Sequence, residues 1–303
     1  MSEIFYWILN MSITGTLLGI LLYLLRYIKK IPRFSIYALW SIVLIRLSIP
    51  FAISSKYSFM NLLTNKMVKS VSVPDLNSWL ITSNYIQVAD SYNPIQYKNI
   101  FWLRFIHISS IIWLIIAIAL LMIVTTIYIL NIVEMKDSTY LYENIYENKK
   151  VSIPMVFGII NPRIILPSNI NPESLRFIIA HEKIHIKRHD NIFRMVAIFI
   201  ACIHWFNPFI WFFLRVFLND LEIACDAGVI KNLKDEDRSL YALSLLKYNQ
   251  KEPSKFISTF GGSKMKKRIM NIITYKKLTI LSTICFILLF GGITVIALTN
   301  ASR

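Results

Sequence analysis

Residues 180–190 read Ala180-His181-Glu182-Lys183-Ile184-His185-Ile186-Lys187-Arg188-His189-Asp190, and this stretch decides how the rest of the chain is interpreted. It contains the pattern H-E-x-x-H. In a helix, His181 and His185 lie one turn apart on the same face, where two imidazoles can hold one Zn²⁺. Glu182 then lies beside the metal without binding it, and it can move a proton from water to a leaving amine. The stretch predicts a metallopeptidase site.

The residues before the motif carry the signals of a helix start. Asn171 is a capping residue, Pro172 suits the first helical position, and Glu173 adds an acid to the first turn. No Gly or Pro follows before Pro208, so we expect the motif to lie well inside a helix. The same five residues also fit an amphipathic helix whose His and Glu side chains are merely solvated. A third ligand is needed to separate these two interpretations.

The composition predicts an integral membrane protein. Of the 303 residues 55% are hydrophobic, the mean hydropathy is +0.54, and the formal net charge is +16. This combination is typical of membrane proteins with basic segments at the lipid surface rather than of soluble basic proteins. The cysteines Cys202, Cys225 and Cys285 show neither paired nor C-x-x-C spacing. The sequence therefore suggests neither a disulfide framework nor a thiolate zinc site.

Apolar runs predict four membrane spans, at about residues 4–25, 36–53, 105–133 and 278–298. Basic residues gather directly after the first run, which places that loop in the cytoplasm and the N-terminus outside. By alternation, residues 54–99 form the largest outside loop, and residues 1–134 make up an N-terminal transmembrane region. Arg46, inside the second run, is expected to anchor that helix near its outer end.

Residues 135–277 predict a cytoplasmic α+β domain inserted before the last span. Short β-prone runs broken by prolines occupy residues 138–170 and lead into the helix of the motif. A strand beside the metal can bind an extended substrate by strand addition, or the strands can simply brace the helix. The sequence does not separate these two roles.

The apolar run at residues 191–217 predicts a hairpin that dips into the membrane and returns. Asn207-Pro208 breaks the run in its middle, and proline both removes a backbone donor and disfavours helix at the residue before it. Residues 219–277 then contain twelve Lys or Arg against seven acids, which favours a cytoplasmic location. Residues 299–303 are expected to form a short outside tail.

A third metal ligand is available after the hairpin. Glu222 and Asp226 share a helical face, and either can complete a gluzincin-like site of two histidines and a carboxylate. The metzincin pattern requires Gly and His at the positions of Arg188 and Asn191, so that alternative fails. His189 is therefore expected at the surface or next to the ligands rather than on the metal.

Several motifs occur in a fixed order along the chain. After the proline-rich β segment come His181-Glu182-x-x-His185-Ile186-Lys187-Arg188-x-Asp190, then His204-Trp205-Phe206-Asn207-Pro208, then Glu222-x-x-Cys225-Asp226. Over about residues 1–300 this combination closely resembles the membrane metallopeptidases of the BlaR/MecR type, the bacterial β-lactam sensor-transducers and their relatives. The resemblance implies Zn²⁺ held by His181, His185 and Glu222, with Glu182 as general base.

The resemblance also implies a function in signalling. A cytoplasmic protease domain of this type inactivates a winged-helix repressor of resistance genes, of the BlaI/MecI type. In the β-lactam sensors a penicillin-binding domain follows the last span, whereas residues 299–303 leave no room for one. We therefore expect no covalent β-lactam binding, and the chain either answers another signal, through residues 54–99 or a partner, or is a truncated relative of those sensors.

Self-cleavage is implied by the same resemblance, in the cytoplasmic segment ahead of the last span. A small-residue stretch around Thr259-Phe260, followed by a basic run, is expected to be exposed, and a cut between these two residues would fit. The same residues also fit a flexible linker with a basic anchor that contacts membrane lipid. The sequence by itself favours the linker.

Two other functional classes compete with a signalling peptidase. A membrane-protein quality-control or CAAX-type protease has a Glu-x-x-Ala-Asp motif similar to Glu222-x-x-Cys225-Asp226, and its substrates would be broader. A non-catalytic receptor or scaffold would not need the intact His181, Glu182 and His185. Direct nucleic-acid binding is not expected, since topology explains the basic charge. A homodimer remains open.

Overall fold

A computed structural model describes residues 2–27, 33–50, 54–57, 100–168, 170–231, 233–249, 258–275 and 280–301. Its helices are α1 (Ser2–Leu25), α2 (Arg33–Ser48), α5 (Ile100–Met135), α6 (Pro172–Lys187), α7 (Asp190–Ile203), α8 (Pro208–Ile230), α9 (Asp235–Asn249), α10 (Ser258–Ile273) and α11 (Ile280–Leu298). Its strands are β1 (Ser54–Ser55), β2 (Thr139–Tyr142), β3 (Ile145–Glu147), β4 (Met155–Phe157), β5 (Arg163–Leu166) and β6 (Asn300–Ala301). Residues 58–99 of the predicted outside loop lie outside the described residues.

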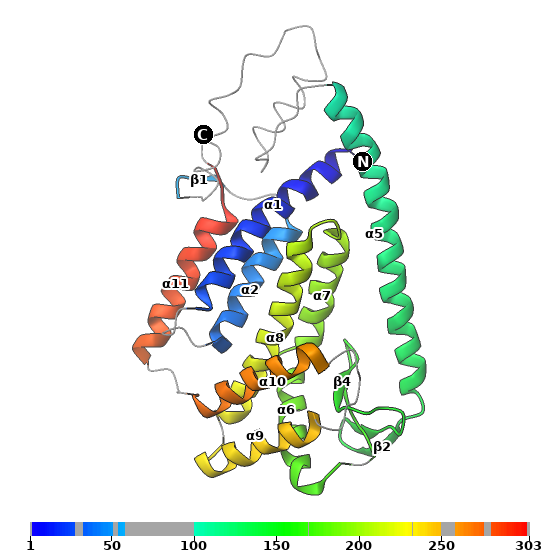
Figure 1. The fold of residues 1–303 in the computed structure, drawn as a ribbon, viewed down its shortest axis with the longest axis vertical. Helices are drawn as coiled ribbons and strands as arrows, with labels where there is room; N and C mark the ends of the chain where they lie inside the picture. Colours follow the sequence, from blue (N-terminus) through cyan, green and yellow to red (C-terminus); the bar gives the residue numbers. More distant parts are fainter. Residues whose placement is uncertain are drawn as a thin grey trace.

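Two groups of elements make up the described chain (Figure 1). Helices α1, α2 and α11 lie side by side, and the pair α7 and α8 packs against them. Helix α5 runs along the other side of this bundle. The four-stranded sheet and helices α6, α9 and α10 gather at one end of the bundle, away from β1 and β6. The H-E-x-x-H helix therefore lies directly below the helical bundle.

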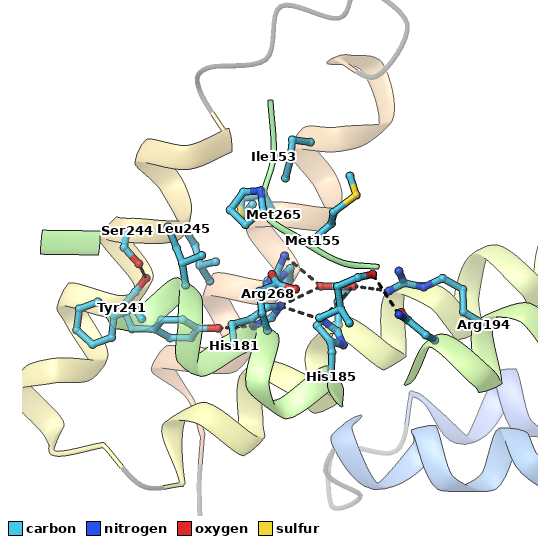
Figure 2. A pocket seen from close by; sticks show the side chains of 17 residues that line it. Ile153, Met155, His181, His185, Arg194, Tyr241, Ser244, Leu245, Met265 and Arg268 are labelled. Atoms are coloured by element: carbon cyan, nitrogen blue, oxygen red, sulfur yellow. Dashed lines mark hydrogen bonds and ion pairs between the residues drawn. The ribbon is translucent and has the colours of Figure 1, made fainter. Parts of the chain in front are cut away.

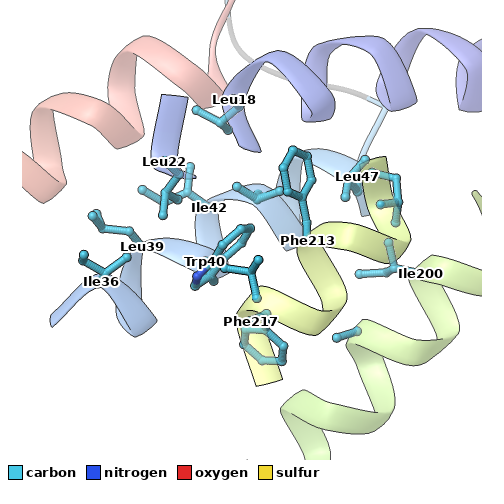
Figure 3. Packing of buried hydrophobic residues seen from close by; sticks show 14 of the residues in the cluster. Leu18, Leu22, Ile36, Leu39, Trp40, Ile42, Leu47, Ile200, Phe213 and Phe217 are labelled. Atoms are coloured by element: carbon cyan, nitrogen blue, oxygen red, sulfur yellow. The ribbon is translucent and has the colours of Figure 1, made fainter. Parts of the chain in front are cut away.

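The bundle is held together by an apolar core (Figure 3). Its buried members come from α1, α2, α7, α8 and α11, and they include Leu18, Leu22, Leu39, Trp40, Ile200, Phe213 and Phe217. Gly19 allows α1 to approach α8 closely, because a Cβ at this position would lie 2.3 Å from the Phe213 ring. Burial of this apolar surface fixes α2 against α8, the helix that carries Glu222.

Two of the described helices are long and apolar enough to cross a membrane, Ser2–Leu25 and Phe105–Met135. The stretches Ser35–Ser48 and Ile284–Leu298 are shorter apolar helices. All four coincide with predicted runs. Arg46 was expected to anchor α2 at its outer end, but its side chain is only 3% exposed and lines a cavity with residues of α1 and α11. It lies inside the bundle because α11 packs along α2.

The break between α7 and α8 lies where the sequence predicts it. Helix α7 ends at Ile203 and α8 begins at Pro208, whose missing N–H costs no hydrogen bond at a first helical position. Asn207 caps α8, and its side-chain amide donates to Ser12 Oγ at 2.8 Å and to Thr16 Oγ1 at 2.7 Å. The turn is thereby attached to α1.

The predicted β segment forms a sheet with the strand order β2-β3-β5-β4. β3 and β5 are parallel, and the two outer strands pair antiparallel to them. Ile145, Ile164 and Leu166 pack with Ile178, so the sheet rests on α6. β4 is an edge strand, and it lines the same cavity as the H-E-x-x-H helix.

Two expectations about helix boundaries are wrong. The motif was predicted to lie well inside a helix, but α6 ends at Lys187, two residues after His185. His189 adopts the left-handed conformation, with φ 56° and ψ 35°, which stops α6 and starts α7 at Asp190. The stretch around Thr259 was predicted to be an exposed linker, but its backbone is helical from Ser258 onward.

Candidate metal centre

Helix α6 brings its two histidines to one point. Asn171 caps the helix by accepting a hydrogen bond from the backbone N–H of Glu173 at 3.0 Å, with Pro172 at the first position, as predicted. His181 and His185 are each 6% exposed, and their Nε2 atoms lie 3.1 Å apart. Two ring nitrogens this close, on neutral imidazoles, can share one cation.

Glu222 of α8 reaches the same point. Its Oε2 lies 3.4 Å from His181 Nε2, and its Oε1 lies 3.8 Å from His185 Nε2. Burial raises the pKa of Glu222, but hydrogen bonding to His181 and the charge of Arg268 outweigh it and hold the pKa well below its usual range. The carboxylate is therefore ionised at neutral pH, as a metal ligand must be.

Asp226 lies on the other side of His181. Its Oδ1 is 3.3 Å from Nδ1 of that ring and accepts a 2.6 Å hydrogen bond from the Tyr241 hydroxyl. Because the Tyr241 hydrogen points to Asp226, the 2.9 Å contact between Tyr241 and His181 requires Nδ1–H of the ring as donor. Nε2 of His181, the ring nitrogen that faces Glu222 at 3.4 Å, would give up its hydrogen when a metal binds and would then offer its lone pair to the cation.

Arg268 of α10 compensates the charge of Asp226. Its Nε and Nη2 each donate to one carboxylate oxygen at 2.8 Å, and its Nη1 lies 3.5 Å from Glu222 Oε2. Burial raises the pKa of Asp226, but the guanidinium holds it well below its usual range. Asp226 is therefore a partner of His181 and Arg268, and the geometry favours Glu222 as the third ligand.

Asp190 holds the second histidine. His185 Nδ1 donates to its Oδ2 at 2.7 Å, and the carboxylate is fully buried. Both rings thus use Nδ1–H for a protein partner and turn Nε2 to the same point, an arrangement common at metal sites. In the sequence, Asp190 is part of a motif, and no role for it was predicted. The available signal was an acid five residues after His185. A helix that ends between the two residues can bring this acid back toward the His185 ring.

Cys225 is a residue whose place the sequence did not reveal. Its Sγ lies within 4.8 Å of the candidate ligand nitrogens of His181 and His185. The thiol donates to the backbone carbonyl of His181 at 3.2 Å, whereas Glu222 presents two oxygens directly to the Nε2 atoms. Glu222 and Cys225 are therefore the two candidate third donors beside the histidines.

His181, His185 and Glu222 line a cavity of about 240 Å³ (Figure 2). Glu182 is 8% exposed and lines the cavity, and among the described residues no ion pair or side-chain hydrogen bond engages its carboxylate. Residues 153–156, leading into and along β4, line one wall, and Tyr241 and Leu245 of α9 line another. A carboxylate beside the ligand cluster remains available to a substrate.

Three other predicted site residues lie outside the cluster. His189 is exposed, and its ring makes no contact that connects it to the cluster within the described part of the chain. Thr259 and Phe260 lie in the first turn of α10, and their side chains are outside what the structure describes. Of the sequence-predicted residues, the structure brings together His181, Glu182, His185, Glu222 and Asp226.

Metal binding at this site is expected to weaken as the pH falls. Burial lowers the pKa of His185, but its hydrogen bond to Asp190 outweighs burial and raises the pKa to about 9. In the metal-free protein this ring is protonated at neutral pH, whereas a metal requires an unprotonated Nε2. Zinc titrations in two buffers of different ionisation enthalpy should show proton release at about pH 7 and an affinity that rises toward pH 9. A pH-independent affinity would contradict this.

Comparison with known proteins finds relatives named BlaR1 or mecR1. The chain is 27% identical over 270 residues to the methicillin resistance mecR1 protein of Staphylococcus aureus, covering 79% of this chain and 45% of that protein. It is 26% identical over 288 residues to the regulatory protein BlaR1 of the same organism (84% and 48%). It is 28% identical over 156 residues to regulatory protein BlaR1 of Bacillus licheniformis (47% and 26%). The chain spans less than half the length of each of these relatives.

The family comparison covers both the helical bundle and the candidate metal centre. A model of the BlaR1 peptidase M56 family matches residues 6–272, from α1 to the end of α10. The match includes the H-E-x-x-H helix, Glu222 and Arg268. The chain therefore belongs to the BlaR1 peptidase M56 family.

Proposed function

We propose that this chain is a zinc metalloendopeptidase of a membrane signalling pathway. The observation that carries the proposal is the convergence of His181 Nε2, His185 Nε2 and the Glu222 carboxylate within 3.1–3.8 Å of one another. Two imidazoles and one carboxylate are a donor set that suits zinc and leaves room for a further ligand. Membership of a peptidase family supports the same chemistry.

The chain's own residues divide the catalytic work. When bound, zinc supplies a Lewis acid that polarises a peptide carbonyl and favours attack by water near neutral pH. Glu182 accepts a proton from the attacking water and passes it to the leaving amine nitrogen. Asp226 and Asp190 keep the two imidazoles in the tautomer that presents Nε2.

The edge strand β4 binds the substrate in an extended form. The backbone N–H of Ile164 donates to the carbonyl of Asn144 and so points toward β3. Because backbone groups alternate in direction along a strand, those of the next residue, Ile165, point the other way and face Met155 of β4. By the same alternation, Val156, the residue after Met155, points its backbone N–H and carbonyl away from β5 toward the open edge. The side-chain amide of Asn191 donates to this carbonyl at 3.1 Å. The Val156 N–H remains directed at the cavity edge and is suited to strand addition. This favours a binding role for β4 over a purely bracing one.

The exposed apolar surface of α5 and the pairing of β1 with β6 support the membrane arrangement that we propose. Helix α5 exposes most of an apolar face, with only 11% of its most apolar window buried, which suits lipid rather than water. β1 pairs in parallel with β6, so residues 54–55 and 300–301 lie on one side. We place that side outside the cell and residues 135–277 in the cytoplasm, with residues 191–217 dipping into the membrane beside α1 and α2.

The substrate we propose is a winged-helix repressor of the BlaI/MecI type, and the chain itself. The names of the relatives, regulatory protein and methicillin resistance protein, support a role in the control of resistance genes. A cut at Thr259-Phe260 requires the first turn of α10 to unwind, since an extended segment is needed at β4. Helix α10 also carries Arg268 into the site, so the proposed cut lies in the same helix as a residue that pairs with Asp226.

Purified full-length protein in detergent should contain one zinc per chain and should cleave an added BlaI/MecI-type repressor at one position. A chelator should stop cleavage, and zinc should restore it, because the three ligands are needed together. Mass spectrometry of the fragments also tests the expected cut in α10. Absence of zinc would overturn the proposal, and cleavage that persists in chelator would overturn the metal mechanism.

A further inference from the structure

We propose that Tyr37 of helix α2 is a positioning residue for the metal centre, an inference that rests on the zinc peptidase function proposed above. The Tyr37 hydroxyl donates to Asp190 Oδ1 at 3.0 Å, and Asp190 Oδ2 accepts from His185 Nδ1 at 2.7 Å. A membrane helix is thereby connected to a metal ligand through a single carboxylate.

The carboxylate has little freedom to reorient. Asp190 is fully buried, so no solvent replaces a lost donor. One oxygen faces His185, and the other faces Tyr37 and the Arg188 guanidinium, whose Nη2 lies 3.3 Å away. Arg188 also lies over the Tyr37 ring, 4.4 Å from its centroid. The position of the hydroxyl therefore contributes directly to the orientation of Asp190, and through it to the His185 ring.

The Tyr37 ring is held by the two neighbouring helices. It stacks on Phe217 of α8, with the ring centroids 5.7 Å apart and an interplanar angle of 17°. Phe193 of α7 contacts it edge-on at 6.4 Å. The hydroxyl is thus placed by packing at the junction of α2, α7 and α8. Figure 3 shows Phe217 pointing into this same core beside Trp40.

A second buried contact joins the same membrane helices to the other ligand-bearing helix. Asp220 of α8, two residues before Glu222, is fully buried and accepts from Trp40 Nε1 at 2.9 Å and from Arg26 Nη2 at 2.7 Å. Helix α2 thus contacts Asp190, which bonds to His185, and it also contacts α8, the helix that carries Glu222. A shift of α2 that breaks the 3.0 Å contact of Tyr37 changes the site without touching the metal.

The test is the zinc affinity of the full-length protein, measured by chelator competition for four variants. Tyr37→Phe keeps the ring and removes the hydroxyl, and it should weaken zinc binding about fivefold, the usual worth of one hydrogen bond. Asp190→Asn should weaken it about 10- to 100-fold. The double variant should bind as Asp190→Asn does, because the two residues act through one contact.

The matched control is Tyr23→Phe. Tyr23 also packs on α8, through Phe212 at 5.1 Å, but within the described part of the chain its hydroxyl bonds to Tyr27 and to no other group. This variant should bind zinc as the wild type does. Equal losses in Tyr37→Phe and Tyr23→Phe would overturn the inference, as would additive losses in the double variant. Should Asp190→Asn fail to fold, the pair of tyrosine variants decides the question. A wild-type protein without zinc would instead overturn the proposed function and this inference with it.

Discussion

Replacing Glu182 with glutamine is expected to reduce peptide cleavage about 10²- to 10⁴-fold while zinc remains bound. Glutamine has nearly the same size and cannot take a proton from water, so only the proton transfer is lost. Glu182 lines the cavity, and its carboxylate makes no hydrogen bond or ion pair with either histidine in the described part of the chain, so the ligand cluster should stay intact. Cleavage rates of an added repressor and zinc content, measured on the same preparation, check both halves of the prediction.

The control for this variant is Glu143→Gln, the same chemical change outside the cavity. Glu143 is exposed and pairs with Lys183 on the outer face of α6 at 2.8 Å. It should leave both zinc content and cleavage unchanged, because exposed ion pairs contribute little. Full activity in Glu182→Gln would remove Glu182 from the mechanism. Loss of zinc in the same variant would show that Glu182 supports the ligands instead.

The second large effect is expected for Glu222→Ala, which should weaken zinc binding more than about 100-fold, since even partners behind the ligands are worth 10- to 100-fold. The substitution removes the carboxylate that, among the described residues, faces both Nε2 atoms, at 3.4 and 3.8 Å. Arg194 and Arg268 both pair with Glu222, so the substitution also removes an acid that lies beside these two guanidinium groups. Positive charge that remains there opposes a cation further.

Cys225→Ser is the matched variant, because it tests the competing donor. Serine can still donate to the carbonyl of His181 but offers no thiolate. We expect zinc affinity to change little. If Cys225→Ser loses zinc and Glu222→Ala keeps it, the ligand assignment moves to the thiol. Retention of zinc in both variants would show that the two histidines have another third partner.

Local sequence patterns were sufficient for much of the helical framework. Asn171-Pro172 marks the start of α6, and Asn207-Pro208 marks the start of α8, because capping and the missing proline N–H act within one turn of chain. The two histidines on one face follow from the helical repeat alone. The β segment was recognisable from its proline-bounded runs.

The same patterns failed where a single residue changes the backbone direction. No Gly or Pro marks the end of α6, and His189 takes the left-handed conformation without them. The helix therefore ends two residues after His185, and the turn at His189 brings the Asp190 carboxylate into contact with the His185 ring. The helical start of α10 was also missed, since Gly261-Gly262 disfavours a helix that packing against α8 and α9 holds in place.

By itself, the sequence determined that His181 and His185 share a helix face, with Glu182 next to the first of them, in an apolar, basic chain, because helical periodicity and hydropathy depend only on neighbouring residues. Only the tertiary structure decided that Glu222 faces Nε2 while Asp226 faces Nδ1, although both occupy one face of α8. It also decided that Asp190, Tyr37 and Cys225 belong to the site. These contacts depend on how α2, α6 and α8 pack, and the burial of distant apolar side chains sets that packing.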